Sequence, residues 1–213
     1  MKTDVTRPLI TLLVLMAARL SFAQEQWLGI YLQGQKIGYA RSAERDDKLN
    51  GSAVKRVETT NLLKSKMLGS DFEMRIESTS WVGPDGKPRR IQFSTVSSGR
   101  KQNVLAEFNG QTIDVRIDNS GAKTRKRLNV PAGARVVDDA TFAVADPSKL
   151  KAGSRQTLYV LDPITVSLVK NEVVYKGLEK VRVPTGEFTA HVVEIIDPRA
   201  TTRVFLSSKG DLV

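Results

Sequence analysis

Strict alternation of apolar and charged residues is the feature that most constrains the fold of this chain. Residues 71–77 place Phe72, Met74 and Ile76 between charged neighbours, and residues 113–118 repeat the pattern. Successive side chains of a β-strand point to opposite faces, so a period of two predicts half-solvated antiparallel strands. Further candidate strands cover residues 27–32, 37–43, 54–63, 91–97, 104–108, 158–161, 165–170, 173–175, 190–196 and 202–206.

Turn-forming residues separate these candidate strands at short intervals. Glycine, asparagine, aspartate and proline gather at residues 33–34, 50–51, 84–87, 109–110 and 119–121. Asparagine followed by glycine favours a two-residue hairpin turn, because both central positions of that turn need a positive φ. The short spacing favours a meander of antiparallel strands over alternating strands and helices.

One segment departs from the strand pattern. Residues 138–145 begin with two aspartates and end before Pro147, which predicts a short helix, and residues 147–150 allow a second one. The ordinary hydrophobic content of 40% argues against disorder over the whole chain. We therefore expect a mainly β single domain over residues 24–213, either complete or truncated at its carboxyl end. Its form is a curved antiparallel sheet or a partly open barrel with one or two short helices.

The amino terminus has the three-part pattern of a secretory signal peptide. Lys2 and Arg7 precede the apolar run at residues 8–18, and small residues at positions 21 and 23 suit a cleavage site. The apolar run is shorter than the roughly 20 residues that span a membrane. We expect residues 1–23 to be removed between Ala23 and Gln24, and the chain to be exported, either to the periplasm or fully secreted. The alternative is a retained amino-terminal anchor.

Positive charge is in excess over the whole chain and concentrates in one run. The net charge is +10, which favours anionic partners such as envelope components or lipid. The densest basic run contains Lys123, Arg125, Lys126 and Arg127. On a strand, Lys126 would face opposite to the others, and the remaining cations could bind an anion. The alternative is a solvated basic surface. We expect no nucleic-acid partner, because the run lacks aromatic residues for base stacking and the chain carries an export signal.

Residues for catalysis or metal binding are scarce. The chain has no cysteine, and His191 is its one histidine. A histidine alone on a strand is more often structural, although a hydrolase using His191 with a nearby serine or aspartate is a third hypothesis. The adjacent acids Asp46-Asp47 and Asp138-Asp139 lack the regular oxygen-ligand spacing of a calcium loop. We expect this chain to be no enzyme and to hold no metal or cofactor.

The two ends of the expected domain carry a family resemblance. Residues 27–31 (WLGIY) and 34–39 (GQKIGY) are similar to the start of the amino-terminal domain of some bacterial exported transglutaminase-like proteins. Residues 204–213 resemble the closing hairpin of that domain, and also the β-sheet domains of the periplasmic lipoprotein-carrier type. The latter resemblance implies a curved antiparallel sheet with helices inside. The transglutaminase reaction would need a cysteine that this chain lacks.

The resemblance and the missing catalytic residues favour a non-catalytic exported module. We expect it to be the amino-terminal accessory domain of a longer transglutaminase-like envelope protein, with a catalytic domain beyond Val213 as its partner. The alternative is a periplasmic carrier that binds a lipid or a lipoprotein. That alternative predicts a continuous apolar pocket lined by Phe72, Met74, Ile76 and Phe93.

Overall fold

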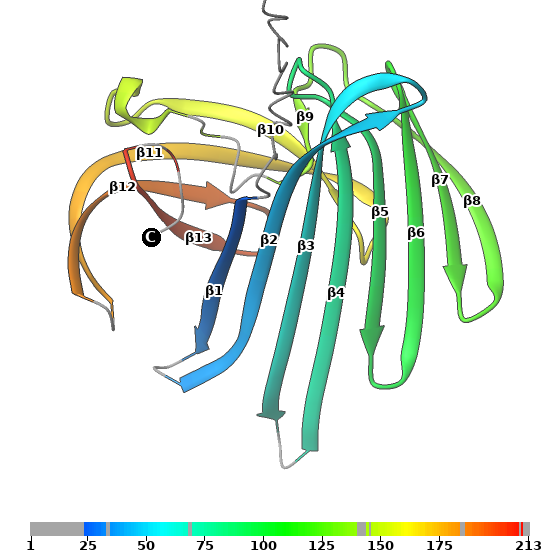
Figure 1. Cartoon of the computed structure of the whole chain (residues 1–213), viewed down its shortest axis with the longest axis horizontal. Helices are drawn as coiled ribbons and strands as arrows, with labels where there is room; N and C mark the ends of the chain where they lie inside the picture. The colour runs from blue at the N-terminus through cyan, green and yellow to red at the C-terminus, as the bar shows by residue number, and fades with distance from the viewer. Residues whose placement is uncertain are drawn as a thin grey trace, which may run out of the picture.

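The chain forms two β-sheets, and its computed structural model describes residues 24–32, 35–67, 70–139, 144, 146–183, 186–208 and 210. Figure 1 shows the strands of one sheet side by side, with a second set of strands running across them at one end. Sheet A consists of β1 (Gln24–Leu32), β2 (Gln35–Leu49), β3 (Ser52–Met67), β4 (Ser70–Val82), β5 (Pro88–Ser97), β6 (Arg100–Asn109), β7 (Thr112–Asn119) and β8 (Ala122–Asn129). Sheet B consists of β9 (Val136–Val137), β10 (Arg155–Asp162), β11 (Ser167–Val183), β12 (Gly186–Ile196) and β13 (Thr201–Leu206).

Sheet A is a continuous antiparallel meander, because its strand order in space is the order of the sequence. Asn50 and Gly51 join β2 to β3 with φ values of 52° and 82°. Both residues therefore adopt the positive φ that the two-residue hairpin turn requires. Ser98-Gly99 and Ser120-Gly121 form the same kind of turn between β5 and β6 and between β7 and β8.

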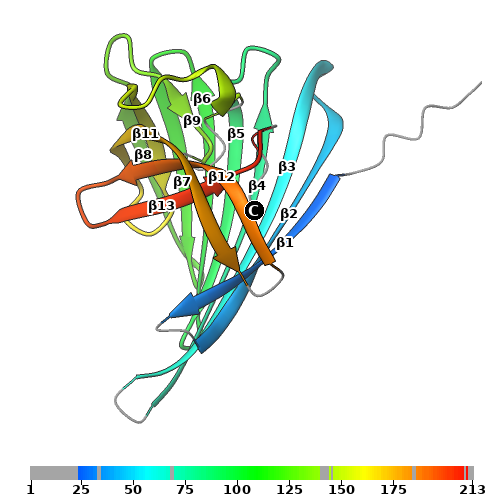
Figure 2. The same ribbon diagram turned by 90° about the vertical axis from the view of Figure 1, so that its left-hand side faces the viewer.

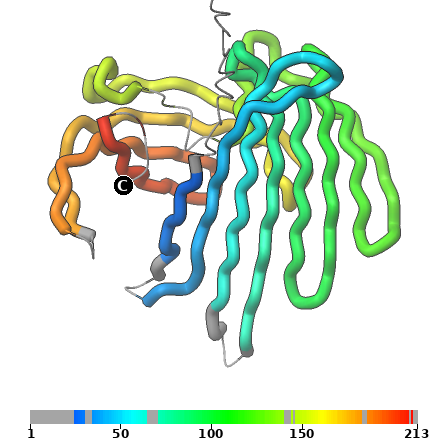
Figure 3. Tube along the Cα trace, in the orientation of Figure 1, coloured from blue at the N-terminus to red at the C-terminus, as the bar shows by residue number. Residues whose placement is uncertain are grey.

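The expected mainly β fold is confirmed. The described strands form curved sheets whose outer strands, β1 and β8 in sheet A, and β9 and β13 in sheet B, have no second partner strand. These sheets therefore do not close into a barrel. Within sheet B all pairings are antiparallel except β9 with β10, which is parallel. Figure 3 traces the chain from the meander into sheet B.

Several sequence predictions fall outside the described residues or need correction. The expected signal peptide, the turn at 33–34 and most of the expected helix at 138–145 lie outside them, and the described Asp138, Asp139 and Val144 are not helical. The helix expected after Asp146 is one 3₁₀ turn, η1 (Pro147–Lys149). The basic run forms strand β8, which the alternation rule had missed because its residues are charged on both faces.

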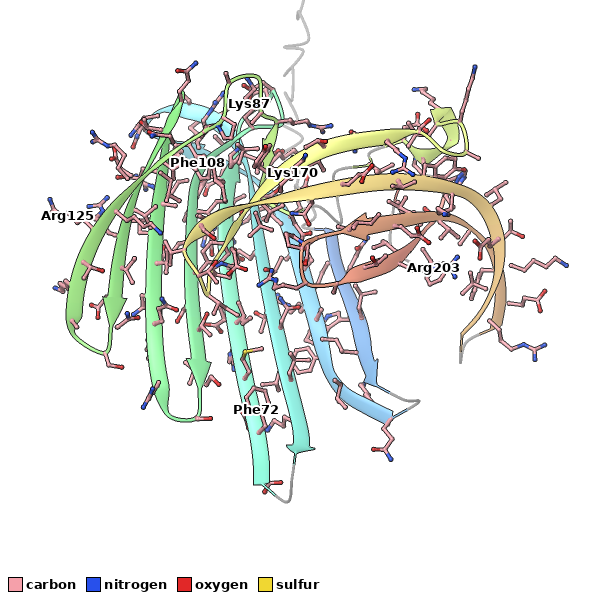
Figure 4. All side chains as sticks on the ribbon, turned by 180° about the vertical axis from the view of Figure 1, so that it is seen from behind. Phe72, Lys87, Phe108, Arg125, Lys170 and Arg203 are labelled. Carbon is pink, nitrogen blue, oxygen red and sulfur yellow. The ribbon has the colours of Figure 1, made fainter. Side chains whose placement is uncertain are left out.

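Sheet B covers only part of one face of sheet A. Ile91, Phe93, Val104 and Val115 from β5–β7 form a buried cluster, and Leu161 from the end of β10 packs into it. Figure 4 shows this face from behind, with sheet B crossing in front of the upper part of sheet A. We call this covered side the inner face of sheet A, and the opposite side its outer face.

A second apolar cluster lies on sheet B itself. Its buried members include Leu158, Val173, Tyr175, Val193 and Leu206 from β10–β13. Figure 2 shows that sheet B crosses sheet A at a steep angle. It also shows that β11 and β12 bend away from the rest of sheet B at one end. The first cluster joins sheet B to one end of sheet A, whereas the second holds the strands of sheet B together. No strand of the described residues covers the other end of β1–β4 (Figures 1 and 4).

Candidate functional site

The uncovered end of β1–β4 carries apolar side chains on its inner face. The strand register places Leu63 opposite Met74, and Asn61 opposite Ile76. These residues lie on the same side as Phe93, because Ser78, which follows Ile76 on that face, pairs with Phe93. Figure 4 shows Phe72 on the lower part of β4, away from the crossing of sheet B. We call the half-buried apolar residues of this region the inner strip: Leu28, Ile30, Leu63, Phe72, Met74 and Ile76.

The inner strip has a low centre. On β2 the residues opposite Leu28 and Ile30 are Ala40 and Gly38. Larger side chains therefore stand on β1 on one side and on β3–β4 on the other, with small residues between them. Because neighbouring strands lie about 4.8 Å apart, the four strands span about 14 Å. Asn61 is the polar exception within this region.

Half-burial distinguishes the inner strip from the core. Ile91 and Val104, on the covered part of the same face, are 0% and 2% exposed, whereas every residue of the inner strip keeps an intermediate exposure. Phe93 is 7% exposed and belongs to the core cluster. The sequence predicts that Phe93 lines one pocket with Phe72, Met74 and Ile76. For Phe93 this prediction is wrong, because sheet B packs over it.

The outer face of the same strands is polar and internally paired. Glu25 accepts hydrogen bonds from Arg41 Nε at 2.9 Å and from the Trp27 indole at 2.6 Å. Trp81 lies between the guanidinium groups of Arg56 and Arg90, whose carbons are 5.5 and 5.8 Å from its ring centre. These contacts pair much of the outer face within the protein, although the Nε atoms of Arg56 and Arg90 are buried without a hydrogen-bond partner among the described residues and Trp27 is 60% exposed.

The basic run is split by the strand that it forms. Lys126 lies opposite Val115, and its Nζ donates to the carbonyl of Val166 at 2.9 Å, so it ties β8 to the turn before β11. Arg127 pairs with Asp114 at 2.7 Å. Of the predicted anion-binding residues, these two therefore have structural partners within the protein.

Arg125 and Lys123 remain exposed on the outer face, and neither forms an ion pair with another described residue. Arg125 stands directly opposite Arg116 of β7, a like-charge pair in which Arg116 is also bound to Glu107 at 2.6 Å. Both arginines line an open depression of about 470 Å³. Figure 4 places Arg125 at the free edge of sheet A. Arg116 is a member of this basic surface that the sequence run could not reveal, because it lies on the preceding strand.

His191 is buried beside Tyr175. Its Nδ1 lies 2.7 Å from the Tyr175 hydroxyl, and the two residues are 8% and 6% exposed. The pair sits on adjacent strands of sheet B, next to the apolar cluster to which Tyr175 belongs. The hydrogen bond to Tyr175 gives His191 a partner within sheet B.

The adjacent acids do not converge on a common point. Asp46 and Asp47 are neighbours on β2 and therefore point to opposite faces. Asp46 pairs with Lys55 at 3.0 Å, whereas Asp47 accepts a hydrogen bond from the backbone N–H of Lys48 at 2.7 Å. Among the described residues no group of three or more histidine, cysteine or acidic side chains could hold a metal ion.

Asp138 is the acid whose environment is most unusual. Burial raises the pKa of its carboxyl above the ordinary value, and the neighbouring charge of Asp139 raises it further. Hydrogen bonds from backbone groups and from the Ser80 hydroxyl lower it only in part. Ser80 belongs to the inner face of β4, so Asp138 links the segment after β9 to the covered part of sheet A.

No helix in the part of the chain that the structure describes is both long enough and apolar enough to cross a membrane.

Comparison with known proteins assigns the chain to a family. Residues 28–212 match the family model described as "Protein of unknown function (DUF3108)", and the chain belongs to that family. Among solved structures it resembles a beta-barrel-like protein of the domain of unknown function DUF1849 from Brucella abortus, with a TM-score of 0.55. The sequence identity is 13%, and the match covers 81% of this chain and 78% of that chain. A likeness at this identity concerns the fold alone. No curated protein matches the sequence.

Proposed function

We propose that this chain is a non-catalytic exported module that binds the acyl chain of an amphiphile on its inner strip. The observation that carries the proposal is the contrast along one face of sheet A. Where sheet B covers that face, the apolar residues are fully buried, and beyond the crossing they stay half-exposed. Exposed apolar area favours an apolar occupant, because its removal from water contributes about 25 cal/mol per Å².

The shape of the inner strip favours a linear occupant. Ala40 carries only a methyl group and Gly38 has no side chain, which makes β2 the lowest strand of the inner strip. The backbone of Leu62 already fills the Cβ position of Gly38. An acyl chain is narrow and flexible enough to lie in such a space, whereas a protein partner would need a broader interface of about 800 Å² on each side. We therefore propose an acyl chain as the occupant of the inner strip.

Adjacent leucines of β3 provide a matched test. Leu63 faces inward and Leu62 faces outward, and both are half-buried. Titration with the neutral dye Nile red should give saturable binding that a monoacylglycerol displaces. We expect Leu63→Asn to weaken dye binding about tenfold or more, because a polar amide would enter the inner strip. Leu62→Asn should leave it within about twofold. Equal effects of the two substitutions, or no saturable binding at all, would reject the proposal.

The resemblance of the two ends to transglutaminase-like proteins supports the proposal that the chain is an accessory domain of a longer protein. In that setting the chain would be an accessory domain that holds an amphiphilic ligand for a catalytic domain supplied beyond Val213. The test is the reading frame itself. A continuation into a domain with cysteine, histidine and aspartate would support this part, and a stop codon after Val213 would count against it.

A second binding role is favoured by the like-charge pair on the outer face. We infer that Arg116, Arg125 and Lys123 dock the protein onto a surface of anionic lipid. Glu107 already compensates the charge of Arg116 at 2.6 Å, so Arg125 and Lys123 carry the uncompensated charge, and a guanidinium group matches phosphate oxygens well. The alternative is that these charges only keep the free edge of β8 from pairing with another chain.

Sedimentation with phosphatidylglycerol vesicles separates these two readings. The double variant Lys123→Gln, Arg125→Gln should bind about thirtyfold more weakly if each cation contributes about 1 kcal/mol at the membrane surface. The control Lys149→Gln, Arg155→Gln removes equal charge from exposed residues at the start of sheet B. Equal loss in the two variants would indicate a net-charge effect and would overturn the docking surface.

A further inference from the structure

Four polar side chains form a row across the inner face of β1–β4. Gln26 lies opposite Ser42, Ser42 opposite Thr59, and Thr59 opposite Ser78. All four residues are half-buried. None of their side chains makes a hydrogen bond to another residue that the structure describes. We call these residues the hydroxyl row.

The hydroxyl row borders the inner strip directly. On three of the four strands the next residue along the same face is apolar: Leu28 on β1, Ala40 on β2 and Ile76 on β4. On β3 it is Asn61. At its end on β4 the row meets Phe93 of β5, which sheet B covers. On β1, β2 and β4 the inner face therefore changes from apolar to hydrogen-bonding within one residue pair, at the edge of the covered region.

Such a border suits the junction between the tail and the head group of an amphiphile. Hydroxyl groups both donate and accept, and an amide side chain offers both functions as well. Half-buried groups of this kind stay in contact with water, so a ligand that covers them must replace that water with hydrogen bonds of its own. A head group placed over Ser42 and Thr59 would leave its acyl chain on the inner strip.

The charges around the hydroxyl row select the type of head group. Beyond Ser42 on the same face of β2 the next residue is Glu44, whose carboxylate pairs with Lys55 at 3.1 Å. Lys55 also pairs with Asp46 at 3.0 Å, so this cation is shared between two acids. On β4 the residues of this face from Phe72 to Ser80 are uncharged. On β2–β4, an anionic head group at the row would thus meet Glu44 and a Lys55 that two acids already share.

We propose that the amphiphile bound on the inner strip carries an uncharged, hydroxyl-bearing head group that hydrogen-bonds to Ser42, Thr59 and Ser78. This inference rests on the proposed function, since it needs the acyl chain on the inner strip. It adds a selectivity that the inner strip alone does not provide. A site built to hydrogen-bond a hydroxyl group discriminates against an otherwise similar ligand that lacks it.

Three ligands with the same acyl chain test the head-group selectivity. They are 1-oleoylglycerol, oleate and methyl oleate, each used to displace Nile red from the full chain below its aggregation concentration. We expect 1-oleoylglycerol to bind about tenfold more tightly than the other two, as two additional hydrogen bonds would give. Equal affinity for all three would overturn the head-group inference and leave the acyl-chain proposal intact. Displacement by none of them would reject the proposed function itself.

Adjacent threonines of β3 supply the matched variants. Thr59 belongs to the hydroxyl row, and Thr60 points to the outer face opposite Glu77. Thr59→Val keeps the shape of the side chain and removes its hydroxyl group, and Ser78→Ala removes the hydroxyl group beside it. This double variant should lose the preference for 1-oleoylglycerol while it still binds methyl oleate. Thr60→Val should retain the preference. If the double variant keeps the preference for 1-oleoylglycerol, the hydroxyl row does not bind the head group. The same conclusion follows if Thr60→Val abolishes the preference to the same extent.

Discussion

Gly38 on β2 lies so close to Leu62 on β3 that a Cβ atom at position 38 would stand 1.9 Å from the Leu62 carbonyl oxygen. No side chain fits at this distance, so the close approach of the two strands depends on glycine. Gly38→Ala should destabilise the protein by about 2 kcal/mol or more, because backbone must move. Urea denaturation measures the change. Ser42→Ala, farther along the same strand, is the control and should cost much less. An unchanged midpoint for Gly38→Ala would show that the strands separate easily.

The buried pair Tyr175 and His191 predicts a specific cost for one hydroxyl group. Tyr175→Phe leaves the Nδ1 of His191 without its partner at 2.7 Å and should cost about 1–3 kcal/mol of stability. Tyr159→Phe is the matched control, because the Tyr159 hydroxyl has no hydrogen-bond partner among the described residues. If the two substitutions shift the denaturation midpoint equally, the pair contributes no stability.

Two aspartates should respond to pH with opposite signs. Burial acts to raise the pKa of Asp162. Hydrogen bonds from the backbone N–H groups of Thr165 and Ile164 and from Arg199 outweigh burial, and its pKa is lowered. Its stabilising contribution is therefore present above the unfolded value of about 3.9 and is lost as the pH falls through the folded pKa. At pH 7, Asp162→Asn should destabilise the protein by about 1–2 kcal/mol.

The raised pKa of Asp138 reverses this relation. Its folded state favours the protonated acid, so stability falls as the pH rises from about 3.9 through the folded pKa. Asp138→Asn removes that penalty and should make the protein more stable than the wild type at pH 7. Thermal unfolding between pH 3 and pH 7 measures both variants. A loss of stability in Asp138→Asn at pH 7 would contradict the account of its environment.

Position along one strand decides the cost of deleting an apolar side chain. Ile91 on β5 is fully buried under sheet B, whereas Val96 on the outer face of the same strand is 40% exposed. Ile91→Ala should cost about 2–5 kcal/mol through the cavity that it leaves. Val96→Ala should cost less than about 1 kcal/mol. Similar costs at the two positions would mean that sheet B does not seal this part of sheet A.

Much of the fold follows from local patterns in the sequence. The alternation around Phe72, Met74 and Ile76 correctly predicts a half-buried strand, and the turn at Asn50-Gly51 has the predicted conformation. Strand β8 escapes the alternation rule because the pairing that holds it comes from β7, and charges occupy both of its faces. Propensity and periodicity describe one strand at a time and cannot report such a partner.

The candidate site could be predicted only in part, because it depends on where sheet B crosses sheet A. The sequence places Phe72 and Phe93 in equivalent patterns, yet one is half-exposed and the other belongs to the core. The hydroxyl row is invisible in the sequence, since its four residues come from four strands and meet only through the register. Register depends on long-range pairing and turn geometry, which no single segment encodes.

The position of a bound acyl chain tests the central claim most directly. A crystal of the protein grown with 12-bromododecanol would locate the bromine by its anomalous signal. The account predicts bromine within about 4 Å of the inner strip, against side chains such as Leu63 and Met74. Bromine found only on the outer face, around Trp27 and Leu62, or no ordered bromine at saturating ligand, would contradict it.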